Sequence, residues 1–207
     1  MSTIKLHRFP LSGHSHRVEL FLSLLGLDAE IITVDLANGA QKTPAFLQLN
    51  RFGQVPVLED GDIILSDSNA IISYLASRYD DARRWLPFDG LAAAQVQRYL
   101  SIAAGLLAFG PAKARVANVF GTAVDTEKAI AMAHGLLAVL DVELADRDWL
   151  VGEYPTLADV ANYTYIAHAP EGDVALDDYP HVRAWLQRIE NLPGFIPMQA
   201  TAVGLAA

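Results

Sequence analysis

Two short segments of this chain combine residue types that suit the recognition of a small peptide. Pro56 follows Val55 just before a predicted strand, and proline, which cannot donate to a sheet, belongs at a strand start or an edge. A Val-Pro bond can also be cis, which would turn the Val55 N–H and C=O out of the sheet towards a peptide-like ligand. Asp67 and Ser68 stand at a predicted helix start, where a carboxylate, a hydroxyl and free backbone N–H groups come together. The two segments indicate a backbone reader and an anion-binding helix end, which suits a small zwitterionic peptide.

The chain contains no cysteine among its 207 residues. This excludes disulfides, thiolate metal sites and every mechanism with a cysteine nucleophile. Any thiol chemistry must therefore use a thiol that the ligand brings. The six histidines include no pair separated by three residues, so no metal site is expected.

The charge balance argues against nucleic acid as a partner. The net charge is −9, whereas nucleic-acid binding requires a clustered basic face, and Arg83-Arg84 is the one adjacent basic pair. No run of eighteen apolar residues is present, so no membrane span is expected. The first residues lack the basic-then-apolar layout of a signal peptide, and we expect a cytoplasmic protein.

Residues 1–79 alternate between strand-like and helix-like segments. A strand–helix–strand unit predicts a parallel pair of strands with a right-handed crossover. Asp60-Gly61 predicts a hairpin that adds antiparallel strands. The predicted strands are 4–7, 30–35, 57–58 and 63–65, and the predicted helices are 15–25, one that opens at Thr43-Pro44, and 68–79.

The second part of the chain is helical throughout. Residues 80–88 are polar and then broken by proline, which is typical of a linker. Thr156 and Asp159 have the spacing of a capping box, with Asp in place of the usual Glu. We therefore predict a domain over 1–79, a linker over 80–88 and an all-α domain over 89–207, with helices over 91–109, 126–144, from 155 onwards and over 180–190.

At this point the chain resembles the cytosolic glutathione S-transferases, and in particular bacterial members of the serine type with phi- or theta-like segments. Residues 10–18 are similar to the catalytic-serine segment, and residues 52–56 and 67–71 to the two glutathione-reading segments. Residues 155–159 look like the buried capping motif of the sixth helix of that family. The resemblance covers nearly the whole chain. It implies an α/β plus all-α fold, with a thioredoxin-like domain followed by a helical domain, and a homodimer.

The resemblance implies that Ser12 donates a hydrogen bond to the sulfur of glutathione. A free alkyl thiol has a pKa of about 8.5, and lowering it by two units requires about 2.7 kcal/mol of preferential stabilisation of the thiolate. A charge-assisted hydrogen bond contributes about 1.5–3 kcal/mol and a helix N-terminus up to about 2. Ser12 lies just ahead of the first predicted helix. Ser15 is the rival, and we interpret it as the N-cap because it immediately precedes the helical run.

The other glutathione contacts also follow from the resemblance. Lys42 would bind the glycine carboxylate, unless it is an ordinary surface lysine. Ser68 would bind the γ-glutamyl carboxylate and Asp67 would face the ammonium group. The family more often has Glu or Gln at the position of Asp67, so a bridging water is an alternative to direct contact. The implied residues are Gln41, Lys42, Gln54, Val55, Pro56, Asp67 and Ser68.

Two further residues have more than one interpretation. Arg17 falls in the first helical turn, where a cation opposes the helix dipole; it either tunes the Ser12 site or pairs with a carboxylate. Phe52 either inserts into a partner subunit, as an aromatic residue does in some classes of the family, or packs into the local core. The electrophile site is expected between the two halves, with Phe9, Leu11, Leu107, Phe109 and Lys113 as its candidates.

The predicted function is that of a glutathione S-transferase that activates glutathione as a thiolate for attack on a small apolar electrophile. One alternative is the glutathione-dependent reduction of disulfides or peroxides. A second alternative is a catalytically silent glutathione-binding or interaction protein, because a fold does not guarantee a function.

Overall fold

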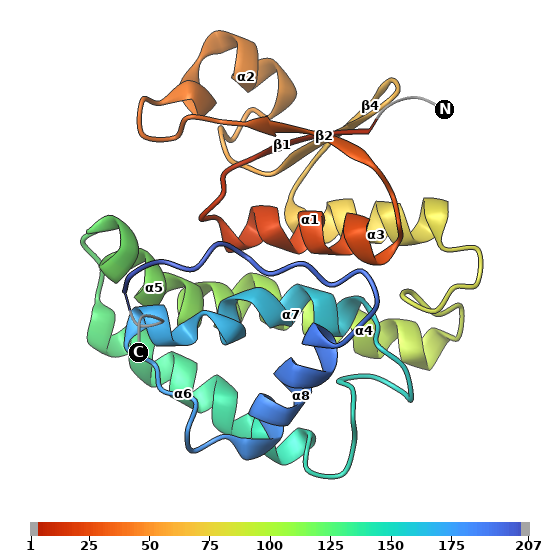
Figure 1. Cartoon of the computed structure of the whole chain (residues 1–207), viewed down its shortest axis with the longest axis vertical. Coiled ribbons are helices and arrows are strands. Elements are labelled where there is room, and N and C mark those ends of the chain that lie inside the picture. Colours follow the sequence, from red (N-terminus) through yellow and green to blue (C-terminus); the bar gives the residue numbers. More distant parts are fainter. Residues whose placement is uncertain (1–3, 204–207) are drawn as a thin grey trace. The chain divides into compact units, whose positions relative to one another are not determined.

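A computed structural model of the chain describes residues 4–203 (Figure 1). These residues form two units. The first comprises residues 4–82 together with Pro193–Gln199, and the second comprises Arg83–Leu192 together with residues 200–203. The returning segment is tied to the first unit by His16, whose Nε2 lies 2.9 Å from the carbonyl oxygen of Ile196.

The first unit is built on a four-stranded mixed sheet in the order β2-β1-β3-β4. β1 (Ile4–Arg8) runs parallel to β2 (Ala29–Thr33) and antiparallel to β3 (Val57–Asp60), which forms a hairpin with β4 (Ile63–Ser66). The pairing confirms the predicted parallel unit and the predicted hairpin. Leu6 pairs with Leu58 in the two central strands, and both side chains are fully buried.

Helices cover both faces of this sheet, as Figure 1 shows. α1 (Gly13–Leu24) and α3 (Ser68–Tyr79) lie on one face, and the short α2 (Pro44–Leu49) lies on the other. A short 3-10 helix, Ala40–Lys42, precedes α2. The apolar residues of α1 and α3 recur at helical spacing and are buried, as expected for amphipathic helices that cover a sheet. They include Val18, Phe21, Leu22, Ile71, Ile72 and Leu75.

The second unit is all-helical. α4 (Gly90–Ile102) continues through a π-helical turn, Ala103–Leu107. The predicted helix over 91–109 thus exists but is not regular. The sequence interpretation did not include α5 (Pro111–Phe120), although Pro111 at its first position and Gly121 with φ 63° just after it are ordinary start and stop signals. The other helices are α6 (Thr126–Glu143), α7 (Leu157–Ala167), the 3-10 helix Ala169–Gly172 and α8 (Pro180–Glu190).

The predicted capping box of α7 is present. Asp159 Oδ2 accepts a hydrogen bond from the Thr156 N–H at 2.8 Å. Asp159 Oδ1 accepts one from the Leu150 N–H and one from the Trp185 indole N–H, each at 2.9 Å. Burial raises the pKa of Asp159, and these hydrogen bonds oppose that rise. The carboxylate therefore ties α7 to the segment before it and to α8.

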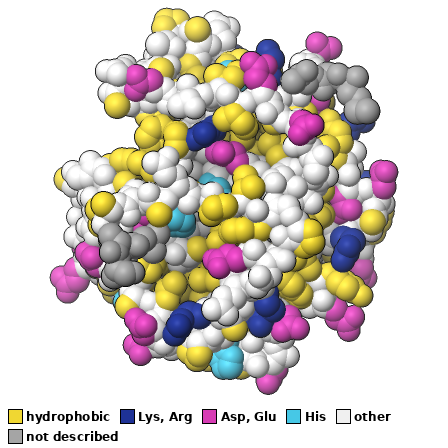
Figure 2. Space-filling model, viewed as in Figure 1, with side chains coloured by type: hydrophobic (Ala, Val, Ile, Leu, Met, Phe, Trp, Pro, Cys, Tyr) yellow, Lys and Arg dark blue, Asp and Glu magenta, His cyan; other side chains and the backbone are white. Residues whose placement is uncertain are grey.

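None of the single helices in residues 4–203 is long and apolar enough to cross a membrane; the bent pair Gly90–Leu107 and Pro111–Phe120, which meet at 41°, passes the length and composition test only together. On the face drawn in Figure 2, acidic and basic side chains are interspersed and do not form one basic patch.

Candidate active site

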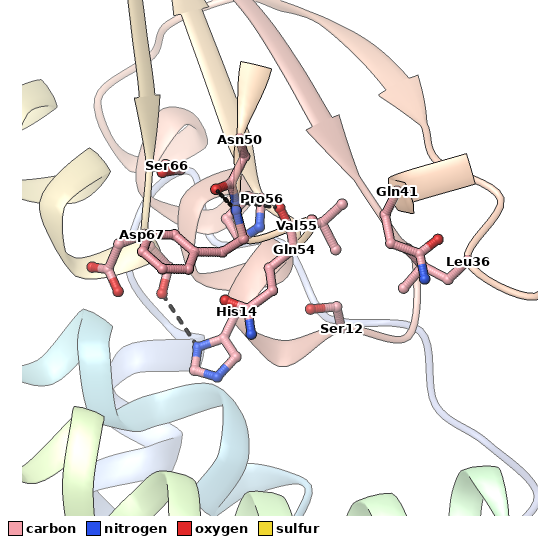
Figure 3. Close-up of a pocket in the computed structure, with 13 residues that line it drawn as sticks. Ser12, His14, Leu36, Gln41, Asn50, Gln54, Val55, Pro56, Ser66 and Asp67 are labelled. Atoms are coloured by element: carbon pink, nitrogen blue, oxygen red, sulfur yellow. Dashed lines mark hydrogen bonds between the residues drawn. The ribbon is translucent and has the colours of Figure 1, made fainter. Parts of the chain in front are cut away.

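The first unit contains a pocket of about 560 Å³ at the ends of its strands and helices (Figure 3). It includes Ser12 and six of the seven residues that the resemblance assigns to glutathione binding. Lys42 is not among the residues that line it. The lining residues are Ser12, His14, Leu36, Gln41, Asn50, Phe52, Gly53, Gln54, Val55, Pro56, Ser66, Asp67 and Ser68.

Ser12 is the N-cap of α1. Its Oγ accepts a hydrogen bond from the Ser15 N–H at 3.2 Å. Because this contact uses only a lone pair, the Ser12 hydroxyl proton can be donated to another group. Ser12 therefore presents a donor at the positive end of α1 and in the pocket.

The prediction that Ser15 is the N-cap of this helix was wrong. The helix begins two residues earlier, at Gly13. Ser15 is fully buried, and its Oγ accepts a hydrogen bond from the Phe9 N–H at 3.2 Å. The prediction missed the first turn because Gly13 and His14 carry no apolar periodicity.

Asn50 shapes the loop that precedes β3. Its Nδ2 donates to the Gln54 carbonyl oxygen at 2.8 Å, and its Oδ1 accepts from the Phe52 N–H at 3.0 Å. The Val55-Pro56 peptide bond is cis. No hydrogen bond of the Val55 backbone is found among residues 4–203. The loop is thus held by the buried side chain of Asn50 and not by the backbone of Val55.

Gly53 is required by close packing within this loop. It has φ 59°, and a Cβ atom there would lie 2.7 Å from the Gln41 carbonyl oxygen and 2.8 Å from Lys42 Nζ. Lys42 Nζ donates to the Phe52 carbonyl oxygen at 3.2 Å. Lys42 is exposed at the edge of the loop, so its predicted role in binding a carboxylate stays a prediction.

Asp67 caps α3 in an unusual backbone conformation. Its φ of 73° lies in the region that favours glycine, and its Oδ1 accepts a hydrogen bond from the Ala70 N–H at 2.9 Å. Such a conformation costs of the order of 1–3 kcal/mol in a residue other than glycine. Strain of this kind gathers at ligand sites, and here it lies where the first N–H groups of α3 meet the pocket.

Ser68 lies in a hydrogen-bonded cluster with two residues of α1. Arg17 Nη1 donates to Ser68 Oγ at 2.7 Å and to Asn69 Oδ1 at 2.9 Å. His14 Nδ1 lies 3.2 Å from Ser68 Oγ, the contact drawn from His14 in Figure 3, and 3.3 Å from Arg17 Nη1. Burial, followed by the charge of Arg17, lowers the pKa of His14 to about 3. His14 is therefore uncharged at neutral pH.

These contacts revise the interpretation of Arg17. The two roles considered for it were tuning of Ser12 and pairing with a carboxylate. The structure places its guanidinium against Ser68 and Asn69, at the start of α3.

Six lining residues were not assigned to the glutathione site from the sequence: His14, Leu36, Asn50, Phe52, Gly53 and Ser66. Asn50 carries a usable signal, because an Asn ahead of Phe52-Gly53 is typical of a turn in which its side chain bonds the backbone. His14 carries none, since a lone histidine at a helix start has no characteristic spacing.

The electrophile candidates are distributed over both units. Phe9 and Leu11 are half-buried in the first unit and are not among the residues that line the pocket. In the second unit Leu107 is fully buried, Phe109 is 60% exposed and Lys113 is exposed. The assignment of these five residues stays a prediction.

Phe52 is 78% exposed. The interpretation that it packs into the local core is therefore wrong, and its insertion into a partner stays as a prediction. No group of three or more His, Asp or Glu side chains within the described part of the chain is arranged to hold a metal ion.

Comparison with known proteins identifies relatives of both units. Residues 2–77 match the family model described as glutathione S-transferase, N-terminal domain, and residues 98–193 match that of the C-terminal domain. Glutathione S-transferase 3 of Zea mays is 37% identical over 209 residues, which cover 94% of this chain and 92% of the relative. Glutathione S-transferase theta-2 of Homo sapiens is 35% identical, with 89% and 79% covered.

Solved structures agree with these relatives. A glutathione S-transferase from Pseudomonas fluorescens has a TM-score of 0.90 at 32% identity, with 96% of this chain and 100% of that chain covered. Glutathione transferase F7 from Populus trichocarpa has a TM-score of 0.81 at 28% identity, with 93% and 96% covered.

Proposed function

This chain belongs to the glutathione S-transferase family and is a transferase of that type, and from this premise we propose that Ser12 activates the thiol of glutathione for attack on an apolar electrophile. The observation that carries the proposal is the place of Ser12: its hydroxyl lines the pocket and stands at the N-terminus of α1, with its proton available for donation.

In this mechanism the chain stabilises an anion and does not act as a base. The thiol releases its proton to solvent, and the Ser12 O–H and the dipole of α1 stabilise the thiolate. The thiolate then forms the bond to the electrophilic carbon, and the leaving group departs with the electron pair of the bond that breaks. Ser12 needs no change of its own protonation state, which suits a hydroxyl without a basic partner.

We place the peptide along the pocket from the loop before β3 to the start of α3. The backbone of Val55 would pair with the cysteinyl unit, and Ser68 with the first N–H groups of α3 would bind the γ-glutamyl carboxylate. Gln54 and Asp67 would add contacts to the peptide at its γ-glutamyl end. Gln41 and Lys42 would meet the glycine carboxylate at the other end.

Substitution of Ser12 separates its capping role from hydrogen-bond donation. Ser12→Asp keeps an N-cap acceptor but has no hydroxyl and adds a negative charge, whereas Ser12→Ala loses both functions and Ser12→Thr keeps both. We expect turnover of an aryl halide to fall by about tenfold or more in the Asp and Ala variants, and Thr to retain most of it. Full activity of Ser12→Asp would show that capping is the only role of Ser12.

The alternative activities are tested on the wild type. Calorimetric titration with glutathione that showed no binding would indicate a silent protein. Faster turnover of a mixed disulfide or a hydroperoxide than of the aryl halide would favour the reductase instead.

We also propose that the chain forms a homodimer. Phe52 is 78% exposed on the first unit. On the second unit, α4, the π-helical turn after it and α6 form a largely apolar groove of about 250 Å³. Leu106 and Val139 line this groove and are 46% and 55% exposed. Large apolar side chains gathered on a surface mark an interface. Sedimentation analysis should give a dimer for the wild type and a shift towards monomer for Val139→Asp; a wild-type monomer would contradict the proposal.

A further inference from the structure

Arg17 is a buried cation that donates a hydrogen bond to a hydroxyl of the pocket. Its side chain is 1% exposed, which is rare for an arginine. The guanidinium Nη1 makes its two shortest hydrogen bonds to Ser68 Oγ at 2.7 Å and to Asn69 Oδ1 at 2.9 Å. Arginine has no acceptor. Ser68 Oγ is therefore an acceptor towards Arg17, and the Ser68 proton must be directed to another group.

His14 Nδ1 is one acceptor for that proton. It lies 3.2 Å from Ser68 Oγ. Arg17 Nη1, which can only donate, lies 3.3 Å from the same Nδ1, so Nδ1 faces two donors and is an acceptor. The uncharged imidazole then carries its hydrogen on Nε2 and accepts the Ser68 proton on Nδ1. His14 and Ser68 both line the pocket, so a carboxylate bound beside Ser68 competes with His14 for the same proton.

We propose that Arg17 is a positioning residue that acts through Ser68. It fixes the Ser68 oxygen as an acceptor, so that the Ser68 hydroxyl can turn its own hydrogen bond from His14 Nδ1 to the carboxylate at the γ-glutamyl end of the ligand. This inference rests on the proposed function, since it names the group that prepares Ser68 for glutathione. It makes the site selective for ligands with a carboxylate at that end. The charge of Arg17 also polarises the Ser68 hydroxyl and makes it a stronger donor.

The electrostatic setting agrees with this role. Arg17 lies in the first turns of α1 and contacts the first residues of α3. Both helix N-termini carry partial positive charge, so a cation there is unfavourable for the fold on its own. An anion bound beside Ser68 benefits from the two helix ends and the guanidinium together.

The first experiment compares two ligands on Arg17→Gln. Calorimetry would measure Kd for glutathione and for γ-aminobutyryl-cysteinyl-glycine, which lacks only the α-carboxylate of the γ-glutamyl unit. We expect Arg17→Gln to weaken glutathione binding by about tenfold or more, the usual effect of losing a charge-assisted contact, with little change for the analogue. Arg78→Gln, which removes an exposed charge at the other end of α3, should change neither. Equal weakening of both ligands by Arg17→Gln would overturn the inference.

The second experiment asks whether Arg17 acts through Ser68. If it does, Arg17→Gln adds little further loss of glutathione affinity in a Ser68→Ala background. Additive losses would contradict the inference. Thermal melts would confirm that each variant folds. If Arg17→Gln does not fold, Arg17→Lys, which keeps the charge, is measured in its place.

The third experiment needs no variant. The ¹⁵N NMR shifts of His14 in the wild type should show Nδ1 unprotonated and accepting, and glutathione should move the Nδ1 signal as the Ser68 proton leaves it. A proton on Nδ1 would overturn the inference. If the wild type bound no glutathione, the proposed function would fail, while the His14 spectrum of the protein alone would still support or contradict the hydrogen-bond arrangement.

Discussion

The carboxylate of Glu171 and the guanidinium of Arg115 form an ion pair in which the two side chains are 0% and 1% exposed. Glu171 Oε1 also accepts a hydrogen bond from the Thr201 N–H at 2.8 Å. Gly172, the next residue, lies so close to α5 that an added Cβ atom would lie 2.5 Å from the backbone nitrogen of Arg115. The pair thus joins α5, the 3-10 helix after α7 and the C-terminal segment within the second unit.

Loss of one partner of this pair should destabilise the fold strongly. Glu171→Gln leaves a buried guanidinium without its counter-charge, and removal of one member of a buried pair costs roughly 3–5 kcal/mol. Denaturant unfolding would measure this loss. Glu153→Gln removes an exposed carboxylate and should change stability by less than about 0.5 kcal/mol. Equal stability of both variants would show that the pair contributes little.

The same pair should make stability depend on pH. Burial by itself raises the pKa of Glu171, but the hydrogen bond from Thr201 and the charge of Arg115 outweigh it and hold the pKa below the ordinary value of 4.5. Because the folded-state pKa is depressed, the stabilisation is complete well above pH 4.5 and is lost as the pH falls through the folded-state value. Unfolding measured from pH 7 downwards should show this decline in the wild type, and a smaller one in Glu171→Gln.

Gly53→Ala should impair glutathione binding more than it impairs folding. The added Cβ would lie 2.7 Å from the Gln41 carbonyl oxygen, so the pocket loop must shift. Gly26→Ala is the matched control, because Gly26 has a similar φ of 65° but no atom within 4 Å of the added Cβ. Both variants should lose about 1 kcal/mol of stability from the left-handed backbone. Only Gly53→Ala should raise KM for glutathione; an unchanged KM would place the ligand elsewhere.

Asp67→Asn separates the cap of α3 from the charge that faces the ligand. Asn and Asp cap helices about equally well, so thermal stability should change little. Loss of the negative charge should raise KM for glutathione several-fold if the carboxylate meets the ligand ammonium, directly or through water. Asp67→Glu, which adds one methylene, should restore or improve KM only if direct contact is limited by reach. An unchanged KM in Asp67→Asn would reduce Asp67 to a capping role.

Asp159→Ala should be among the most destabilising substitutions in the second unit. It leaves the buried Leu150 N–H, the Thr156 N–H and the Trp185 indole N–H without their acceptor. Each unsatisfied donor costs about 1–3 kcal/mol. Asp62→Ala, at an exposed hairpin position, is the control. Comparable melting temperatures for the two variants would contradict the role of Asp159 as a tie between segments.

Much of the fold was accessible from local sequence. Asp60-Gly61 predicted its hairpin because that dipeptide tolerates a positive φ, and Gly61 has φ 61°. Thr156 and Asp159 predicted their capping box because its two contacts span only three residues. The start of α1 and the whole of α5 were missed, because Gly13 and Pro111 begin helices whose first residues show no apolar periodicity.

The site was accessible only where its residues adjoin one another in the chain. Residue types alone predicted a backbone reader at Val55-Pro56, an anion site at Asp67-Ser68 and, through the absence of cysteine, a thiol that the ligand brings. Tertiary structure decided the rest: that Phe52 is exposed, and that Arg17 reaches Ser68, 51 positions away in sequence. The physical reason is the distance along the chain over which each kind of interaction acts. Capping, turns and periodicity act over a few residues, whereas the direction of the Ser68 proton depends on a guanidinium that only the packing of α1 against α3 brings within 2.7 Å.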